Sequence, residues 1–221
     1  MTEVWFIRHG ESLGNTGGRT ASAQSIPLTP HGHTQAADVV AIFPDSPDLI
    51  VMSRYIRTQE TAAPTAARYP KAAKEIWPIE EFTYLDADKY KNTTVEERRP
   101  AAEIYWKAGD LDSVDGEGAE SFNNLLKRVD DTIRRIEECK HARVAVFSHG
   151  LFLHTLEFRL QHPGMPAEEL FQRISEIRVK GHMPNAHIIR AHTDKGRLVL
   201  GEKPQPKVIR EVPKCQKPAP K

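Results

Sequence analysis

Short apolar runs alternate with helix-forming segments along most of the 221-residue chain. The runs at residues 4–7, 49–52 and 144–147 are continuously apolar, which is typical of strands buried on both faces of a sheet. Five further segments predict helices, and the first of them begins at Thr29-Pro30, a favourable N-cap followed by proline at the first helical position. These segments span residues 30–43, 55–69, 122–136, 151–160 and 166–174.

The remaining pattern predicts more strands and one short helix. Residues 73–79 form a strand that Pro78 restricts to a sheet edge or end, and residues 187–191 and 198–200 flank a hairpin turn. We interpret the polar stretch 80–118, with a short helix at 101–107, as an insertion over one face. The alternation predicts an α/β fold, a three-layer sandwich with a mostly parallel central sheet flanked by helices.

We expect one domain over residues 1–202 and a disordered tail, rich in proline and lysine, over residues 203–221. The formal net charge of +1 argues against binding to nucleic acid or to membrane surfaces, since both need a sustained basic excess. No apolar run approaches the length of a membrane span, and the N-terminus lacks the features of a signal peptide. A cytoplasmic location is therefore the expectation.

Polar motifs follow three of the predicted strands. They are Arg8-His9-Gly10, the segment 53–58 with Arg57, and Ser148-His149-Gly150. Because parallel strands end at one edge of a sheet, we expect these motifs to surround one crevice. Guanidinium groups beside imidazoles suit a doubly charged tetrahedral anion such as a phosphate group.

In combination these motifs resemble the histidine phosphatase superfamily, which has the phosphoglycerate-mutase-like fold. The resemblance runs from residue 4 to about residue 191. Leu28-Thr29-x-x-Gly32-x-x-Gln35-Ala36 is similar to the first-helix signature of the family. Ala119-Glu120-Ser121-Phe122 also matches, although the family usually has glycine where Ala119 stands.

The resemblance implies a role for each motif. His9 attacks phosphorus and becomes a transient phosphohistidine, which requires a neutral ring whose other nitrogen is hydrogen-bonded. Arg8 and Arg57 bind phosphate oxygens and stabilise the charge of the transition state. His149 and Asn15 donate further hydrogen bonds to phosphate, and Gly150 belongs to the same binding site. These cationic groups replace a metal ion, so we expect neither a metal nor another cofactor.

A general acid must protonate the leaving oxygen, and in the family it is a carboxylate after the third strand. The family pattern of an apolar residue, any residue and then the acid selects Glu81, and it makes Glu80 a surface residue. Asp86 and Asp88 are weaker candidates for this role. Arg98 and Arg99 could bind a substrate carboxylate or a second phosphate, but a solvated face is the commoner reason for such a pair.

The leading hypothesis is a metal-independent phosphatase that hydrolyses phosphomonoesters of a small metabolite. The alternatives are a phosphoglycerate-mutase-type isomerase, a protein phosphatase acting on phosphopeptides and a catalytically idle scaffold that binds phospho-ligands. In mutases a Gly-x-x-x-Gly-like segment commonly follows the acid, whereas residues 82–86 here read Phe-Thr-Tyr-Leu-Asp, which favours the phosphatase. An idle scaffold is disfavoured because every candidate role is filled. The expected partner is a small phosphorylated substrate, and the oligomeric state is left open.

Overall fold

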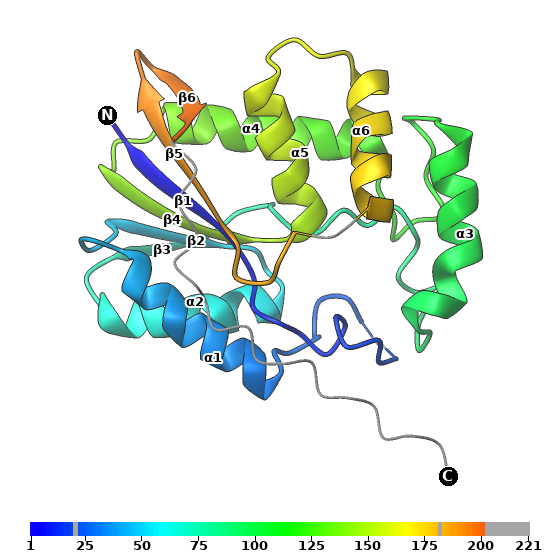
Figure 1. Cartoon of the computed structure of the whole chain (residues 1–221), viewed down its shortest axis with the longest axis horizontal. Coiled ribbons are helices and arrows are strands. Elements are labelled where there is room, and N and C mark those ends of the chain that lie inside the picture. Colours follow the sequence, from blue (N-terminus) through cyan, green and yellow to red (C-terminus); the bar gives the residue numbers. More distant parts are fainter. Residues whose placement is uncertain (20–21, 181–182, 202–221) are drawn as a thin grey trace.

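The computed structural model describes residues 1–19, 22–180 and 183–201, and its centre is a six-stranded sheet with helices on both faces (Figure 1). The strand order is β3-β2-β4-β1-β5-β6. Their bounds are β1 Glu3–Arg8, β2 Leu49–Met52, β3 Ala73–Ile76, β4 Arg143–Ser148, β5 Ile188–Asp194 and β6 Arg197–Leu200. Strands β1 to β4 are parallel and β5 and β6 are antiparallel, so the predicted three-layer α/β fold is confirmed.

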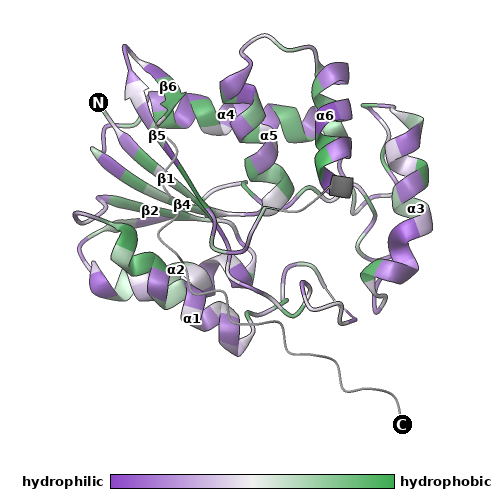
Figure 2. Cartoon of the chain, in the orientation of Figure 1, coloured by the Kyte–Doolittle hydropathy of each residue, from purple (hydrophilic) through white to green (hydrophobic). Residues whose placement is uncertain are grey.

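All the α-helices except α3 form the two outer layers of the sandwich, and α3 lies to one side, beyond α6 (Figure 1). In Figure 1, α1 and α2 lie on one face of the sheet, and α4, α5 and α6 lie on the other. Their bounds are α1 Pro30–Val39, α2 Ile56–Arg68, α3 Val95–Ala108, α4 Phe122–Glu137, α5 Gly150–Gln161 and α6 Ala167–Lys180, with a 3-10 turn at Val40–Ile42. Figure 2 shows why α4 packs on the sheet: hydrophobic and hydrophilic positions alternate along it at helical spacing.

The apolar side chains of β1 alternate between two hydrophobic clusters, one on each face of the sheet. Val4 and Phe6 belong to the apolar cluster on the α4–α5 side of the sheet. Trp5 and Ile7 belong to the cluster that includes residues of α1 and α2. Since successive strand side chains point to opposite faces, a continuous apolar run is what a strand between two helical layers requires.

Several predicted elements have other bounds in the structure. Helix α6 continues to Lys180 instead of ending at residue 174, and β5 continues to Asp194 instead of ending at residue 191. Strand β3 ends at Ile76, three residues earlier than predicted, and it occupies the sheet edge that Pro78 indicated. Helix α3 is longer than the predicted 101–107 segment, because Thr94 and Glu97 form a reciprocal capping box and the helix passes through Pro100. The predicted tail over 203–221 lies outside the described residues. No described helix is long and apolar enough to cross a membrane.

Candidate active site

His9 lies just beyond the end of β1, and its two ring nitrogens have different partners. Nδ1 lies 2.7 Å from the carbonyl oxygen of Gly10. A carbonyl oxygen can only accept, so Nδ1 carries the hydrogen and Nε2 keeps its lone pair. Nε2 accepts a 3.2 Å hydrogen bond from Nε of Arg57, which agrees with that tautomer. The nitrogen left with a lone pair is therefore the one next to the guanidinium.

The surroundings of His9 keep its ring neutral. Burial lowers the pKa of His9 well below its usual value, and the nearby charges of Arg57 and Arg8 lower it further. The hydrogen bond to Gly10 opposes these effects only in part. A neutral imidazole with a directed lone pair can act as a nucleophile near neutral pH.

Arg57, in the first turn of α2, is the cation nearest to the Nε2 lone pair. Its Nη1 donates to the carbonyl oxygen of Ala23 at 2.6 Å, and its guanidinium lies 4.7 Å from the ring centre of Tyr55. Burial lowers its pKa to about 10, while the negative charge of Glu81 raises it. Arg57 therefore stays charged at neutral pH, in a position where the helix dipole favours an anion.

Arg8 provides a second buried guanidinium at the end of β1. Its Nη1 donates to the carbonyl oxygen of Met183, and its Nε has no hydrogen-bond partner among the described residues. Burial lowers the pKa of Arg8, and the nearby charge of Glu81 raises it. A buried N–H without a protein partner is available to a ligand oxygen.

His149 lies behind His9 and is fully buried, so it does not itself line the pocket. The two ring centroids are 5.2 Å apart. His149 Nε2 is hydrogen-bonded to the hydroxyl of Ser53 at 2.8 Å, and its Nδ1 has no partner among the described residues. Burial first, and then the charge of Arg57, lower the pKa of His149 well below its usual value.

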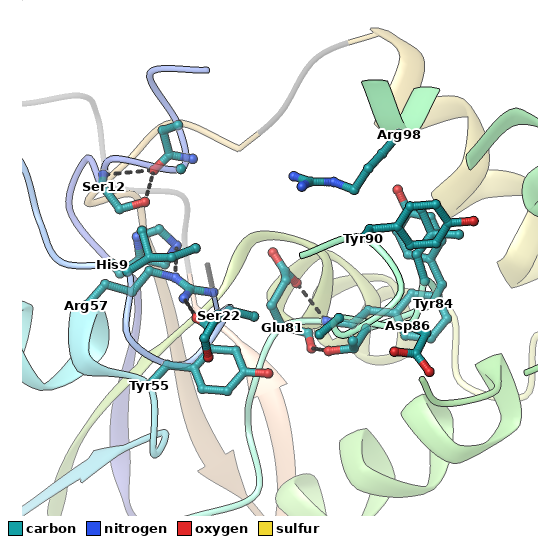
Figure 3. A pocket seen from close by; sticks show the side chains of 18 of the residues that line it. His9, Ser12, Ser22, Tyr55, Arg57, Glu81, Tyr84, Asp86, Tyr90 and Arg98 are labelled. Atoms are coloured by element: carbon teal, nitrogen blue, oxygen red, sulfur yellow. Dashed lines mark hydrogen bonds between the residues drawn. The ribbon is translucent and has the colours of Figure 1, made fainter. Parts of the chain in front are cut away.

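Glu81 faces this cationic group from the other side of the pocket (Figure 3). Its Oε1 accepts backbone hydrogen bonds from Phe82 and Leu151 at 3.0 Å and from Phe152 at 3.2 Å. The latter two belong to the first turn of α5, where free N–H groups attract a carboxylate. The hydrogen bonds between described residues therefore leave Oε2 as the oxygen available to a substrate.

The expectation that Glu80 is a surface residue is wrong. Its side chain is only 11% exposed and forms ion pairs with Arg54 at 3.2 Å and Arg128 at 3.9 Å. Arg128 also donates to the carbonyl oxygens of Pro78 and Glu80, at 2.9 and 3.2 Å. These partners are distant in sequence, and they hold the segment that carries Glu81.

The pocket has a volume of about 290 Å³ and extends from His9 to the segment between β3 and α4. Figure 3 shows His9 and Arg57 on one side, and Tyr84, Tyr90 and Arg98 on the other. The pocket is lined by Arg8, His9, Ser12, Asn15, Tyr55, Arg57, Glu81, Phe82, Thr83, Tyr84, Asp86, Tyr90 and Arg98, among others.

Two predicted residues, Asn15 and Gly150, lie beside the catalytic groups. Asn15 lines it, and its Oδ1 accepts from the N–H and hydroxyl of Ser12, at 3.0 and 2.9 Å, so its amide N–H₂ is the group left for a ligand. Gly150 begins α5, and a Cβ atom there would lie 3.4 Å from Nε of Arg8 and 3.5 Å from Oε2 of Glu81. Gly150 therefore lies directly beside both groups, at distances that correspond to ordinary van der Waals contact.

Three other candidate residues, Arg98, Arg99 and Asp86, have different surroundings. Arg98 lines the pocket and donates through Nη1 to the carbonyl oxygen and hydroxyl of Thr93, so it is not part of a solvated face. Arg99 is exposed and pairs with Glu96 at 2.5 Å. Asp86 lines the pocket, but its carboxylate accepts backbone hydrogen bonds from residues 88, 89 and 118.

Close backbone contacts at Gly10 and Gly32 fix the position of the loop that carries His9. A Cβ atom on Gly10 would lie 2.6 Å from the carbonyl oxygen of Gly32, and one on Gly32 would lie 2.0 Å from that of Glu11. The first turn of α1 therefore packs directly against the loop after β1. Neither position has room for a side chain, which explains why glycine stands in both motifs.

The sequence model of the histidine phosphatase superfamily (branch 1) matches residues 4–200, which is most of the chain. The chain belongs to the histidine phosphatase superfamily. Among members of this superfamily, it is 28% identical over 170 residues to the adenosylcobalamin/alpha-ribazole phosphatase of Escherichia coli (strain K12), covering 76% of this chain and 82% of that protein.

Solved histidine phosphatase structures share the fold. The alpha-ribazole phosphatase from Shigella flexneri superposes with a TM-score of 0.70 at 23% identity, covering 90% of this chain and 95% of that one. A mycobacterial glucosyl-3-phosphoglycerate phosphatase superposes with a TM-score of 0.67 at 20% identity, covering 90% and 96%.

Sequence reasoning missed several residues around the site. Asn185 donates to the carbonyl oxygen of His9 and to Oδ1 of Asn15, both at 3.2 Å, and so joins the two. Tyr55, Tyr84 and Tyr90 line the pocket. No pattern in the sequence distinguished these side chains, because their position depends on contacts between distant segments.

Proposed function

We propose that this histidine phosphatase hydrolyses phosphomonoesters of a small metabolite without a metal ion, through a phosphohistidine at His9. The observation that carries the proposal is the orientation of His9. Its Nδ1–H is committed to Gly10, and its Nε2 lone pair lies beside the guanidinium of Arg57. That is the arrangement an in-line attack on a phosphoryl group requires.

The other residues of the site bind the phosphate oxygens and stabilise their charge. When the substrate binds, Arg57 gives up its hydrogen bond to His9 and donates to phosphate oxygens instead. This frees the Nε2 lone pair of His9. Arg8 and the amide of Asn15 bind further oxygens. His149, whose ring centroid lies 5.2 Å from that of His9, donates to the most deeply seated oxygen, beyond the residues that line the pocket. These donors stabilise the charge on the equatorial oxygens, as metal ions do in other phosphoryl-transfer enzymes.

Glu81 serves as general acid and then as general base. With a proton on Oε2, it protonates the leaving oxygen while the P–O bond to the alcohol breaks and the P–Nε2 bond forms. The resulting carboxylate then removes a proton from water, which attacks phosphorus and releases His9. The bonds from Oε1 to α5 hold the carboxyl group in place through both steps.

The pocket volume favours a small substrate, and the relatives named above act on small phosphorylated compounds. Transfer to water rather than to a second alcohol is favoured by the 82–86 segment, which lines the pocket and reads Phe-Thr-Tyr-Leu-Asp in place of the Gly-x-x-x-Gly-like segment of mutases.

The experiment is hydrolysis of p-nitrophenyl phosphate in the presence of EDTA, with wild type and His9→Ala. We expect unchanged hydrolysis by the wild-type protein with EDTA and no turnover by His9→Ala, with the circular dichroism spectrum preserved. Hydrolysis that EDTA abolishes, or that survives in His9→Ala, would refute the proposal.

A further inference from the structure

We propose that Ser53 and Thr58 fix the tautomer of His149, so that binding of a phosphate dianion is coupled to uptake of one proton on His149 Nδ1. This inference deepens the proposed phosphatase function and rests on it. It assigns Ser53 and Thr58 as positioning residues, which act on substrate through His149.

The hydroxyl of Ser53 is the centre of a buried hydrogen-bond network. It lies 2.8 Å from Nε2 of His149 and 2.9 Å from the hydroxyl of Thr58, and it accepts from the backbone N–H of Tyr55 at 3.1 Å. A hydroxyl has one hydrogen and two acceptor sites. Ser53 can therefore donate to only one of its two side-chain neighbours.

Thr58 decides the direction of these bonds. Its hydroxyl lies 2.7 Å from the carbonyl oxygen of Tyr55, closer than to any other partner. A carbonyl oxygen cannot donate, so the hydrogen of Thr58 points to Tyr55 and its oxygen accepts from Ser53. Ser53 must then accept from His149, and the hydrogen of the neutral His149 ring is on Nε2.

This tautomer leaves Nδ1 of His149 with a lone pair and no hydrogen. Nδ1 is fully buried and has no hydrogen-bond partner among the described residues. The charged and titratable groups that act on the ring are Arg8 from β1, Arg57 from α2, Arg128 from α4 and the neighbouring His9, while the ring of Tyr55 packs on it at 5.2 Å. A bare lone pair cannot donate to a phosphate oxygen and would repel it.

Protonation of Nδ1 removes the repulsion between its lone pair and the phosphate oxygen when the dianion binds. In the free protein, burial and the surrounding guanidinium groups keep His149 neutral. The dianion offsets the positive charge of the guanidinium groups, and Nδ1 then takes a proton from solvent. The imidazolium donates Nε2–H to Ser53 and Nδ1–H to the phosphate oxygen. No bond in the substrate forms or breaks, and the proton leaves with the product phosphate.

The test compares three proteins labelled with ¹⁵N-histidine, with and without inorganic phosphate. In Thr58→Val the Ser53 hydroxyl loses its acceptor and can turn towards His149, which allows the neutral Nδ1–H tautomer to bind phosphate without proton uptake. Thr65→Val is the matched control, because Thr65 is buried in the same helix and its hydroxyl has no hydrogen-bond partner in the part of the chain that the structure describes. The His149 signals are assigned from their loss in His149→Asn.

In wild type and Thr65→Val we expect the neutral Nε2–H tautomer in the free protein and the imidazolium with phosphate bound. Their affinity for phosphate should fall about tenfold per pH unit between about pH 8 and 9, where phosphate is chiefly the dianion. In Thr58→Val, His149 should stay neutral and the affinity should change less than about twofold over that range.

Each other outcome has a distinct meaning. A His149 ring that stays neutral in phosphate-bound wild type overturns the coupling and leaves the phosphatase proposal intact. Imidazolium formation in phosphate-bound Thr58→Val overturns the role of the two hydroxyl groups. Absence of any histidine shift up to high phosphate concentration would mean that the site does not bind phosphate, which overturns the proposed function together with this inference.

Discussion

Replacing Glu81 with glutamine separates proton transfer from positioning. The carbonyl oxygen of glutamine can accept the three backbone hydrogen bonds that Oε1 of Glu81 receives, so the contacts with α5 are retained. The amide nitrogen takes the place of Oε2 and cannot deliver a proton to the leaving oxygen. The variant therefore removes acid catalysis while it keeps the volume of the side chain.

The expected loss depends on the leaving group. General acid catalysis contributes about 10²- to 10⁴-fold, and an alkoxide needs all of it, so kcat/KM for an alkyl phosphomonoester should fall about 10³-fold, equivalent to about 4 kcal/mol. The weakly basic p-nitrophenolate needs little protonation, so kcat/KM for its phosphate ester should fall less than about tenfold. The value of kcat/KM reports the first phosphoryl transfer, from substrate to His9, whereas kcat also includes hydrolysis of phosphohistidine.

The assay measures kcat/KM for both esters in Glu81→Gln and in Glu80→Gln. Glu80 is the matched control because it is the neighbouring carboxylate and is held by Arg54 and Arg128 outside the pocket lining. Glu80→Gln should lower stability and change both esters by the same factor. Equal losses for the two esters in Glu81→Gln would refute its role as general acid.

Other predictions follow from the geometry of the site. Arg57→Lys keeps the charge but not the planar fork of donors, so kcat/KM should fall about 10²- to 10³-fold, and an unchanged value would contradict the role of Arg57. His9 and His149 have lowered pKa values in the fold, so the unfolded chain binds more protons below about pH 6.5. The free energy of unfolding should be highest above about pH 6.5 and fall by up to about 2.7 kcal/mol per unit below it, and urea titrations showing no such slope would contradict the buried neutral rings. A Cβ on Gly32 would lie 2.0 Å from a backbone carbonyl oxygen, whereas one on Gly18 would meet its nearest atom at 3.4 Å. Gly32→Ala should therefore lose about 1–3 kcal/mol of stability in urea titrations and Gly18→Ala less than about 0.5 kcal/mol, and similar losses would contradict the close contact between α1 and the loop after β1.

The parallel core could be predicted because burial on both faces produces apolar runs that local sequence displays. The runs that became β1, β2 and β4 each end at a polar motif, and the rule for parallel sheets was enough to bring those motifs together. The segment between β3 and α4 was harder. Helix α3 is largely polar and contains Pro100, so its apolar period is weak, and it depends on the capping box at Thr94.

The errors and omissions at the site concern contacts between distant segments. Glu80 looks like a surface residue in isolation, but Arg54 and Arg128 bury it as an ion pair. The hydrogen-bond network of Ser53 and Thr58 was missed for the same reason, because its partner His149 lies 96 residues from Ser53. Local patterns identify which residues carry chemistry, whereas tautomers and pairing depend on the assembled fold.

The most direct measurement traps the covalent intermediate. Protein mixed with a ³²P-labelled phosphomonoester and quenched in alkali, where phosphohistidine persists, should carry the label on Nε2 of His9, since Nδ1 is committed to Gly10. Label on any other residue, label on Nδ1, or full turnover with no labelled protein at any quench time would contradict nucleophilic attack by His9.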